Sequence, residues 1–141
     1  MDSTKVREIM SGNVATLTAG QPVDLAGGLM KRSRVRHLPV VKDGDLVGLV
    51  THRDLLRAQA RLFAKAVTIK AGEERVLTVL VDEIMSTELR TVTPDTPAIE
   101  AARQILDNKN GCLPVVEGGE LVGIVTEADF VKWAMRRLDA S

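Results

Sequence analysis

The sequence contains one stretch that occurs twice and decides the fold. Its first copy reads Leu-Pro-Val-Val at 38–41, a short turn, Leu-Val-Gly-Leu-Val-Thr at 46–51, and then Asp54. Its second copy reads Leu-Pro-Val-Val at 113–116, a turn, Leu-Val-Gly-Ile-Val-Thr at 121–126, and then Asp129. In both copies the two apolar runs are joined through an Asp-Gly or a Gly-Gly pair, which is a strong hairpin signal. We therefore expect two similar β-hairpins, each ending in a hydroxyl that is followed three positions later by a carboxylate.

The similarity between the two halves of the chain extends beyond the hairpins. With an offset of 75 positions, residues 6–56 align without a gap with residues 81–131, and 20 of these positions are identical. Apolar residues at helical spacing predict one helix before each hairpin, starting near Pro22 or Pro97, and another helix after it. The sequence therefore predicts an α/β (α+β) fold built from two tandem β-α-β-β-α repeats. Because one repeat of about 50 residues makes a marginal core, we expect the two repeats to pack with pseudo-two-fold symmetry into one module.

The repeat pattern also predicts the boundaries. We place the first repeat at 1–66, a connection at 67–80 and the second repeat at 81–141. Each repeat is expected to begin with a short helical turn and then a short apolar strand. These four segments are 6–10, 14–17, 81–85 and 89–92. The connection is expected to extend the preceding helix at its start, while the pattern of residues 76–81 fits a strand or another state equally well.

Composition and charge favour a soluble globular protein and argue against several other classes. The 19 basic and 19 acidic residues balance, whereas a nucleic-acid-binding protein is expected to carry a basic face. No apolar run reaches the roughly 18 residues of a membrane span, and the N-terminus lacks the pattern of a signal peptide. A single cysteine, Cys112, excludes an intrachain disulfide and fits a reducing compartment. We therefore expect a cytoplasmic protein without membrane contact.

The sequence contains no pattern typical of catalysis or of a metal centre. No nucleophile, base and orienting group occur together, so we do not expect an enzyme. His37, His52 and Cys112, which takes the place of His37 in the second copy, are too few for zinc, which needs four ligands or three and a water. No obligatory cofactor or metal is expected.

The ordered set of motifs resembles the cystathionine-β-synthase (CBS) domain, which occurs as tandem pairs called Bateman modules. The resemblance covers nearly the whole chain. Its motifs are Met-Ser ahead of the first strand, Leu-Pro-Val-Val, and Gly-x-x-Thr-x-x-Asp. They stand at 10–11, 38–41 and 48–54, and again at 85–86, 113–116 and 123–129. Each motif alone is weak, whereas the ordered set present twice at one offset is specific.

The resemblance implies a function in ligand sensing. CBS pairs bind adenosine-containing ligands such as AMP, ADP, ATP or S-adenosylmethionine in clefts between the repeats. By this resemblance, Asp54 or Asp129 accepts hydrogen bonds from the ribose hydroxyls, and Thr51 or Thr126 lies by the ribose or phosphate. Other residues are implied to pack on the adenine or to close its far side. They are Leu38, Pro39, Val40, Leu113, Pro114 and Val115, with Thr16 and Thr91 opposite.

The two copies differ in charge beside these motifs. The first copy has Arg36 and His37 before Leu-Pro-Val-Val, and His52 and Arg53 inside the Thr-x-x-Asp motif. The second copy has Gly-Cys at 111–112 and Glu-Ala at 127–128. Since arginine suits bidentate phosphate recognition, we expect the first copy to supply the phosphate-binding groups. The second would form a nucleoside-type pocket or stay empty. The other interpretation is that these arginines are ordinary solvated side chains.

Two interpretations also stand for the motif and for the whole chain. Thr-x-x-Asp at a helix start can be a capping box as well as a ligand site, and one residue can serve both purposes. We expect a stand-alone regulatory homodimer that senses an adenine nucleotide, and hence cellular energy, or S-adenosylmethionine, and acts on an unidentified separate protein. The alternative is a structural or interaction homodimer with vestigial, unoccupied clefts.

Overall fold

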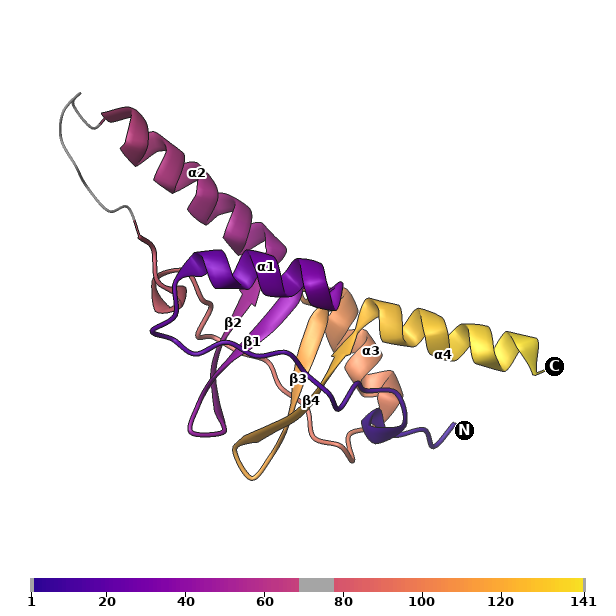
Figure 1. Ribbon diagram of the computed structural model, residues 1–141. Helices are drawn as coiled ribbons and strands as arrows, with labels where there is room; N and C mark the ends of the chain where they lie inside the picture. The colour runs from indigo at the N-terminus through magenta and orange to yellow at the C-terminus, as the bar shows by residue number, and fades with distance from the viewer. Residues whose placement is uncertain (1, 69–77, 141) are drawn as a thin grey trace. The chain divides into compact units, whose positions relative to one another are not determined.

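The computed structural model describes residues 2–68 and 78–140, and its elements confirm both hairpins and the helices around them (Figure 1). The fold is α+β. The first half contains the 3-10 helix η1 (Val6–Glu8), α1 (Val23–Ser33), β1 (His37–Lys42), β2 (Asp45–Thr51) and α2 (His52–Thr68). The second half contains η2 (Val81–Glu83), α3 (Ala98–Asp107), β3 (Cys112–Glu117), β4 (Glu120–Thr126) and α4 (Glu127–Asp139). Of the connection, residues 69–77 lie outside the described part.

The two hairpin turns have the backbone that their sequences predict. Asp43 and Gly44 both have positive φ, 53° and 86°, and so do Gly118 and Gly119, 60° and 87°. A two-residue turn with positive φ at both central positions matches the right-handed twist of the strands that it joins. The Asp-Gly and Gly-Gly pairs supply residues that tolerate this backbone.

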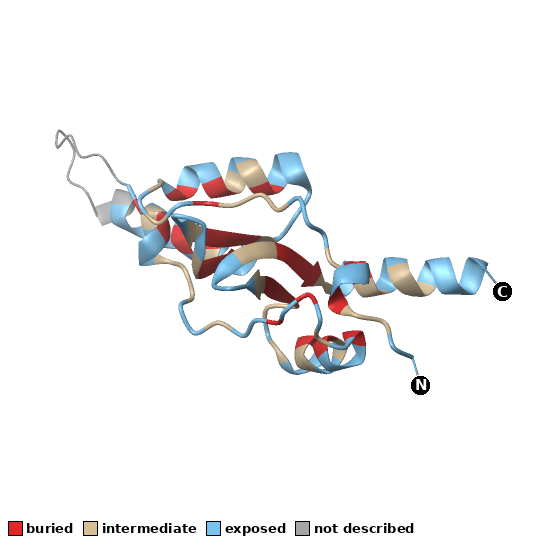
Figure 2. Cartoon of the chain, turned by 90° about the horizontal axis from the view of Figure 1, so that it is seen from below, coloured by how far each residue is buried: buried red, intermediate tan, exposed pale blue. Residues whose placement is uncertain are grey.

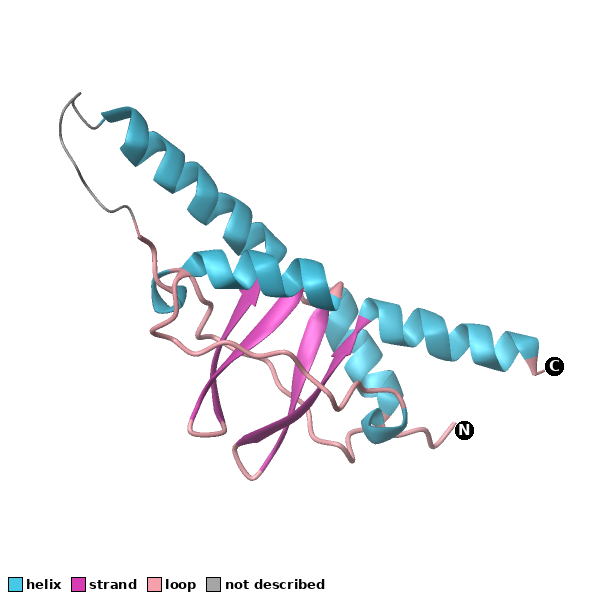
Figure 3. Cartoon of the chain, viewed as in Figure 1, coloured by secondary structure: helices cyan, strands magenta, loops and turns pink. Residues whose placement is uncertain are grey.

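The short strands expected at 14–17 and 89–92 are not formed, and Figure 3 draws both segments as loops. Each is reduced to one residue in a parallel bridge, Leu17 with Val40 and Val92 with Val115. Leu17 donates its N–H to the Pro39 carbonyl (2.9 Å) and accepts from the Val41 N–H (2.8 Å). The pairing stops there because turn residues follow at once, as the Thr18–Gln21 and Thr93–Thr96 backbone hydrogen bonds show.

The chain divides into two compact units that do not coincide with the sequence repeats. Unit 1 consists of residues 2–14, 44–46 and 90–140, and unit 2 of residues 15–43, 47–68 and 78–89. Each unit therefore combines the α-helices and all or most of the hairpin of one repeat with the 3-10 helix of the other repeat. In Figure 2 the strands are largely buried, while the helices show buried residues along one side and exposed residues along the other.

Unit 1 is built on the β3–β4 hairpin, which pairs antiparallel from Cys112↔Thr126 to Glu117↔Glu120. Its core combines η1, α3 and this hairpin, with Val6 and Ile9 from the N-terminal segment among the buried residues. Ser11 extends this packing, since it exchanges two backbone hydrogen bonds with Ile124 of β4 (2.9 and 3.0 Å).

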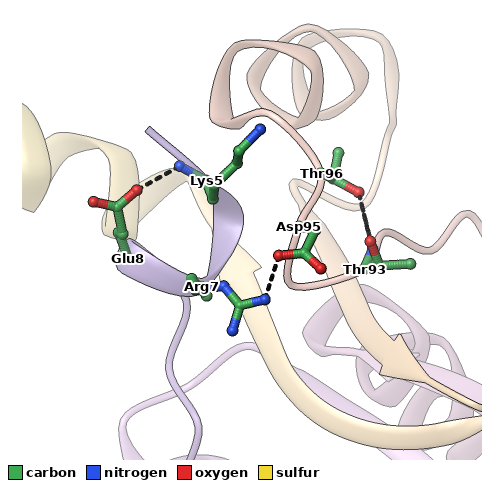
Figure 4. A network of polar contacts seen from close by, with 6 residues as sticks. All are labelled: Lys5, Arg7, Glu8, Thr93, Asp95 and Thr96. Atoms are coloured by element: carbon green, nitrogen blue, oxygen red, sulfur yellow. Dashed lines mark hydrogen bonds and ion pairs between the residues drawn. The ribbon is translucent and has the colours of Figure 1, made fainter. Parts of the chain in front are cut away.

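Polar contacts fix the N-terminal segment of unit 1 from the outside (Figure 4). Arg7 forms an ion pair with Asp95, and the Glu8 carboxylate accepts the Lys5 N–H at 2.6 Å. The Thr93 and Thr96 hydroxyls lie 3.2 Å apart in the neighbouring turn. The Arg7 and Asp95 side chains are largely exposed, so the buried apolar residues supply most of the stability of this attachment.

Unit 2 repeats this plan with β1, β2, α1, α2 and η2. Its core includes Leu38 and Val40 of β1, Val50 of β2, Ala58 of α2, and Val79 and Val81 near η2. Here Ser86 exchanges backbone hydrogen bonds with Leu49 (2.9 and 3.0 Å), just as Ser11 does with Ile124 in unit 1.

Candidate functional site

The Thr-x-x-Asp motifs form the first turns of α2 and α4. The Asp54 Oδ2 accepts the Thr51 N–H (2.9 Å) and the Thr51 hydroxyl (3.0 Å), and the Thr51 Oγ1 accepts the Asp54 N–H (3.2 Å). Thr126 and Asp129 repeat these contacts at 2.9, 3.2 and 3.3 Å. This is a reciprocal capping box, so the capping interpretation of the motif is confirmed in both copies.

Each cap uses one carboxylate oxygen and leaves the other for a second partner. Within residues 2–68 and 78–140, Asp54 Oδ1 has no hydrogen-bond partner, while Asp129 Oδ1 lies 3.4 Å from the Ser11 hydroxyl. Asp54 is half-buried, and Asp129 is 8% exposed. An ionised carboxylate can accept about four hydrogen bonds. Capping and ligand binding are therefore compatible on the same side chain.

The glycine of each motif makes room for the Met-Ser pair of the same unit. A Cβ on Gly48 would lie 2.9 Å from Met85 Cγ, and a Cβ on Gly123 would lie 2.9 Å from both Met10 Sδ and the Ser11 carbonyl oxygen. These separations are too short for real Cβ contacts. Two motif pieces that are far apart in the sequence thus form one packed contact in each unit.

The basic residues of the first copy gather at the start of α2. The His52 N–H donates to the Arg36 carbonyl at 2.8 Å, which places the loop before β1 beside the Thr51–Asp54 cap. Arg36, His52 and Arg53 are exposed, and His37 is half-buried.

The same place in unit 1 has the opposite charge. The Glu127 N–H donates to the Gly111 carbonyl at 3.2 Å. Gly111 has a φ of +70°, and a Cβ there would lie 3.1 Å from Glu127 Oε1. Because a side chain at position 111 would be strained and crowded, unit 1 has no place for an arginine equivalent to Arg36. The charge contrast seen in the sequence is therefore built into the two folds.

The apolar candidates lie inside the cores. Those on β1 and β3 are fully buried: Leu38, Pro39, Val40, Leu113, Pro114 and Val115. Thr16 is half-buried and Thr91 is exposed. Contact of these eight residues with an adenine ring stays a prediction.

Cys112 is also fully buried. Burial raises the pKa of its thiol from 9.0 to about 12, so the side chain is a neutral, compact part of the core. A thiol with so high a pKa is a poor nucleophile and a poor metal ligand at neutral pH. In the described part of the chain, no three His, Cys, Asp or Glu side chains come together as a metal site. No helix of this part is long and apolar enough to cross a membrane.

Unit 2 has a pocket of about 210 Å³ next to Asp54 that sequence reasoning missed. Its lining residues come from α2 and from the segment at η2. They are Asp54, Arg57, Ala58, Arg61, Glu83 and Ile84. A comparison of the two copies beyond the motif would have pointed to this place, because position 58 is alanine and its equivalent, position 133, is tryptophan.

The model of the CBS domain matches residues 6–61 and 81–136, and the chain belongs to this family. The CBS domain-containing protein YhcV of Bacillus subtilis is 33% identical over 128 residues, which cover 90% of this chain and 83% of that protein. The chain spans only 23–45% of three other curated relatives that are 33–37% identical to it. One of these is a homoserine O-acetyltransferase of Methanococcoides burtonii.

Two solved structures that resemble the chain contain ligands. CBSX2, a CBS-pair protein of Arabidopsis thaliana, was crystallised in complex with AMP; it is 30% identical, with a TM-score of 0.76 over 94% of this chain and 96% of that one. The CBS domain pair of protein MJ0100, in complex with 5′-methylthioadenosine and S-adenosylmethionine, is 25% identical. Its TM-score is 0.80 over 96% of this chain and 99% of that one.

Proposed function

We propose that the chain is a regulatory module that binds an adenosine-containing ligand through Asp54, Asp129 or both, and acts on a separate protein. The observation that carries the proposal is Asp54 Oδ1, the carboxylate oxygen that the helix cap leaves without a partner within residues 2–68 and 78–140. A carboxylate accepts the two neighbouring hydroxyls of a ribose through charge-assisted hydrogen bonds. The capping threonine holds the carboxylate in place, so little side-chain freedom would be lost on binding.

The basic groups at the start of α2 support a phosphate-bearing ligand in unit 2. Arg36, His52 and Arg53 gather there, and the positive end of the helix dipole also favours an anion. At the equivalent place unit 1 has Glu127, which repels a phosphate. The AMP of CBSX2 is a ligand of the matching kind.

The first experiment asks what the purified protein carries and what stabilises it. Ultraviolet absorbance and mass spectrometry would identify a co-purified adenosyl compound. A thermal-shift panel of AMP, ADP, ATP, S-adenosylmethionine and NAD would follow, in which a ligand at 100 times its Kd adds about 2.7 kcal/mol. Failure of all of these to stabilise the protein would contradict the proposal.

Calorimetric titration of two variants then tests the site. Asp54→Asn keeps an acceptor for the Thr51 cap but loses the charge, so the affinity should fall by roughly tenfold or more. The double variant Arg36→Ala, Arg53→Ala should weaken AMP and ATP but not a ligand without phosphate. The matched control is Lys31→Ala, Arg32→Ala, which removes two exposed charges from α1 of the same unit. Unchanged AMP affinity in the Arg36 and Arg53 variant would refute the phosphate assignment.

The alternative, a structural homodimer, is favoured by one observation. Large apolar side chains are exposed on α2, α3 and α4, including Phe63 (72%), Leu106 (85%) and Leu138 (73%). Exposed apolar area of this kind is a common feature of subunit interfaces. Sedimentation analysis with and without AMP separates the two functions: a dimer that no adenosyl ligand stabilises or alters favours the structural role. The homodimer, the cytoplasmic location and the protein target all stay predictions.

A further inference from the structure

The pocket of unit 2 extends from Asp54 along the next two turns of α2. Its volume of about 210 Å³ is below the roughly 300–1,000 Å³ of pockets that enclose a whole drug-sized ligand. A nucleoside as a whole would not fit, whereas one end group of a ligand would. Asp54 belongs both to this pocket and to the proposed ribose site, so a ligand bound at Asp54 has a second region within reach.

Position 58, one of the residues that line the pocket, is alanine. Ala58 is fully buried and belongs to the core of unit 2. The equivalent residue of unit 1, Trp133, is half-buried and packs on the core of that unit. The Arg137 Cζ lies over its indole ring, 4.7 Å from the ring centroid. An indole thus occupies in unit 1 the position that a methyl group occupies in unit 2. Near the motif aspartate, the two units therefore differ in the size of one side chain as well as in charge.

The charges that line the pocket are balanced. Arg57 and Arg61 are exposed and one helical turn apart, and within residues 2–68 and 78–140 neither forms an ion pair or a hydrogen bond. Asp54 and Glu83 carry the opposite charge, and each already uses one carboxylate oxygen to accept a backbone N–H. Glu83 Oε2 accepts the Leu80 N–H at 2.6 Å, and Asp54 Oδ2 accepts the Thr51 N–H. When a ribose occupies Asp54 Oδ1, two guanidinium groups and Glu83 Oε1 remain for the end group; without a ribose, Asp54 Oδ1 is available as well.

This balance selects the chemistry of the end group. A phosphoryl dianion would gain two arginines but would also face two carboxylates, and like charges at such distances repel. An ammonium group alone would have the reverse problem. A zwitterion satisfies both sets, because its ammonium donates to the carboxylate oxygens and its carboxylate matches the fork of a guanidinium. Ile84, which is half-buried, supplies apolar surface for the carbon atoms between them.

We infer that the pocket lined by Arg57, Arg61, Asp54 and Glu83 binds an α-amino-acid group, either the tail of an adenosyl ligand or a free amino acid. The first form rests on the proposed function, since it requires the ribose on Asp54. It makes S-adenosylmethionine a better ligand of unit 2 than 5′-methylthioadenosine, which lacks the amino-acid tail. The second form needs no nucleoside.

Calorimetric titration of the full chain with three probes tests the inference. The probes are S-adenosylmethionine, 5′-methylthioadenosine and free L-methionine. We expect S-adenosylmethionine to bind roughly tenfold or more tighter than 5′-methylthioadenosine, the effect of one or more charge-assisted hydrogen bonds. In the double variant Arg57→Gln, Arg61→Gln this advantage should disappear while 5′-methylthioadenosine binds as before. Both side chains are exposed, so the variant should fold normally. The matched control, Lys132→Gln, Arg136→Gln, removes the equivalent charges from unit 1 and should retain the advantage.

The outcomes separate this inference from the proposed function. If 5′-methylthioadenosine and AMP bind but S-adenosylmethionine gains nothing, or its gain survives in the Arg57 and Arg61 variant, the inference is wrong and the proposed function stands. If L-methionine alone binds, and only when both arginines are present, the pocket takes a free amino acid and the adenosyl function is wrong. If none of these compounds binds, both are wrong.

Discussion

An alanine at Gly123 should destabilise the chain more than an alanine at Gly48, although the two glycines occupy equivalent places. A Cβ at 123 would lie 2.9 Å from Met10 Sδ and 2.9 Å from the Ser11 carbonyl oxygen. The nearest atoms to a Cβ at 48 all belong to the Met85 side chain. A methionine side chain can rotate away, since it is unbranched and flexible. The Ser11 carbonyl cannot, because it accepts the Ile124 N–H at 3.0 Å.

The magnitude follows from this difference. Inserting a methyl group into a packed contact costs about 1–3 kcal/mol, and we expect Gly48→Ala at the lower end of this range and Gly123→Ala at the upper end. A weakened Ser11–Ile124 backbone bond adds about 1 kcal/mol at position 123. For 141 residues, an unfolding entropy of about 2.1 cal/mol/K per residue makes 1 kcal/mol equal to about 3 °C in Tm. The expected losses are therefore about 3 °C for Gly48→Ala and about 13 °C for Gly123→Ala, whose two contributions add to about 4 kcal/mol.

Urea and thermal unfolding of the single and double variants would measure both losses. Removing most of the Met85 side chain should rescue Gly48→Ala, so a double-mutant cycle with Met85→Ala should give a coupling of about 1 kcal/mol. Met10→Ala should not rescue Gly123→Ala, because the contact with the backbone of Ser11 remains. Equal losses at the two glycines, or full rescue of Gly123→Ala by Met10→Ala, would refute the reasoning.

Three further predictions concern other parts of the chain. Thr51→Ala and Thr126→Ala should each lower the unfolding free energy by about 1 kcal/mol, while the serine variants should retain most of it; equal losses for serine and alanine would argue against the caps. Because burial raises the pKa of Cys112 to about 12, the unfolded chain loses this proton at lower pH than the folded one. Stability should therefore fall as pH rises above 9. Between pH 8 and 10 the wild type should lose about 1.4 kcal/mol more than Cys112→Ala, and at pH 8 a thiol reagent should label the cysteine only after unfolding. Asp95→Asn, which removes an exposed ion pair with Arg7, should leave the urea midpoint unchanged, and a large shift would show that this contact holds the N-terminal segment.

Local signals were sufficient to predict the hairpins, the helices and the helix caps. Asp43-Gly44 and Gly118-Gly119 specify their turns through backbone conformations that few other residues adopt. Thr51 and Asp54 lie three residues apart, which is the spacing of a reciprocal cap. Because the two copies align at an offset of 75 positions, each conclusion reached for one copy also applied to the other. These features depend on residues close together in the sequence, and such residues are compared directly when a sequence is read.

The incorrect and missing features depend on residues far apart in the sequence. The expected strand at 14–17 is apolar, yet only Leu17 pairs, and its partner is a strand more than 20 residues away. The contact of Met85 with Gly48 was present in the sequence only as two separate motif pieces. The pocket beside Asp54 includes Ala58 in its lining, and no local pattern distinguishes this residue from any other buried helical alanine. The alignment of the two copies contained this information at position 133, outside the motifs.

Each unit contains the 3-10 helix of the other repeat. This exchange has a small entropic cost, and its consequences for the motif aspartate differ between the two units. Met85 and Gly48 are 37 positions apart, whereas Met10 and Gly123 are 113 apart. Because loop-closure entropy rises only with the logarithm of loop length, closing the longer loop costs only about 1 kcal/mol more, which the burial of Val6 and Ile9 readily offsets. In unit 1 this closure brings the Ser11 hydroxyl to within 3.4 Å of Asp129 Oδ1, the oxygen that the cap does not use, 118 positions away. A ligand hydroxyl at Asp129 would therefore compete with the N-terminal segment for the same atom. At Asp54 a ligand meets no such competitor in the described structure, which makes unit 2 the better equipped of the two sites.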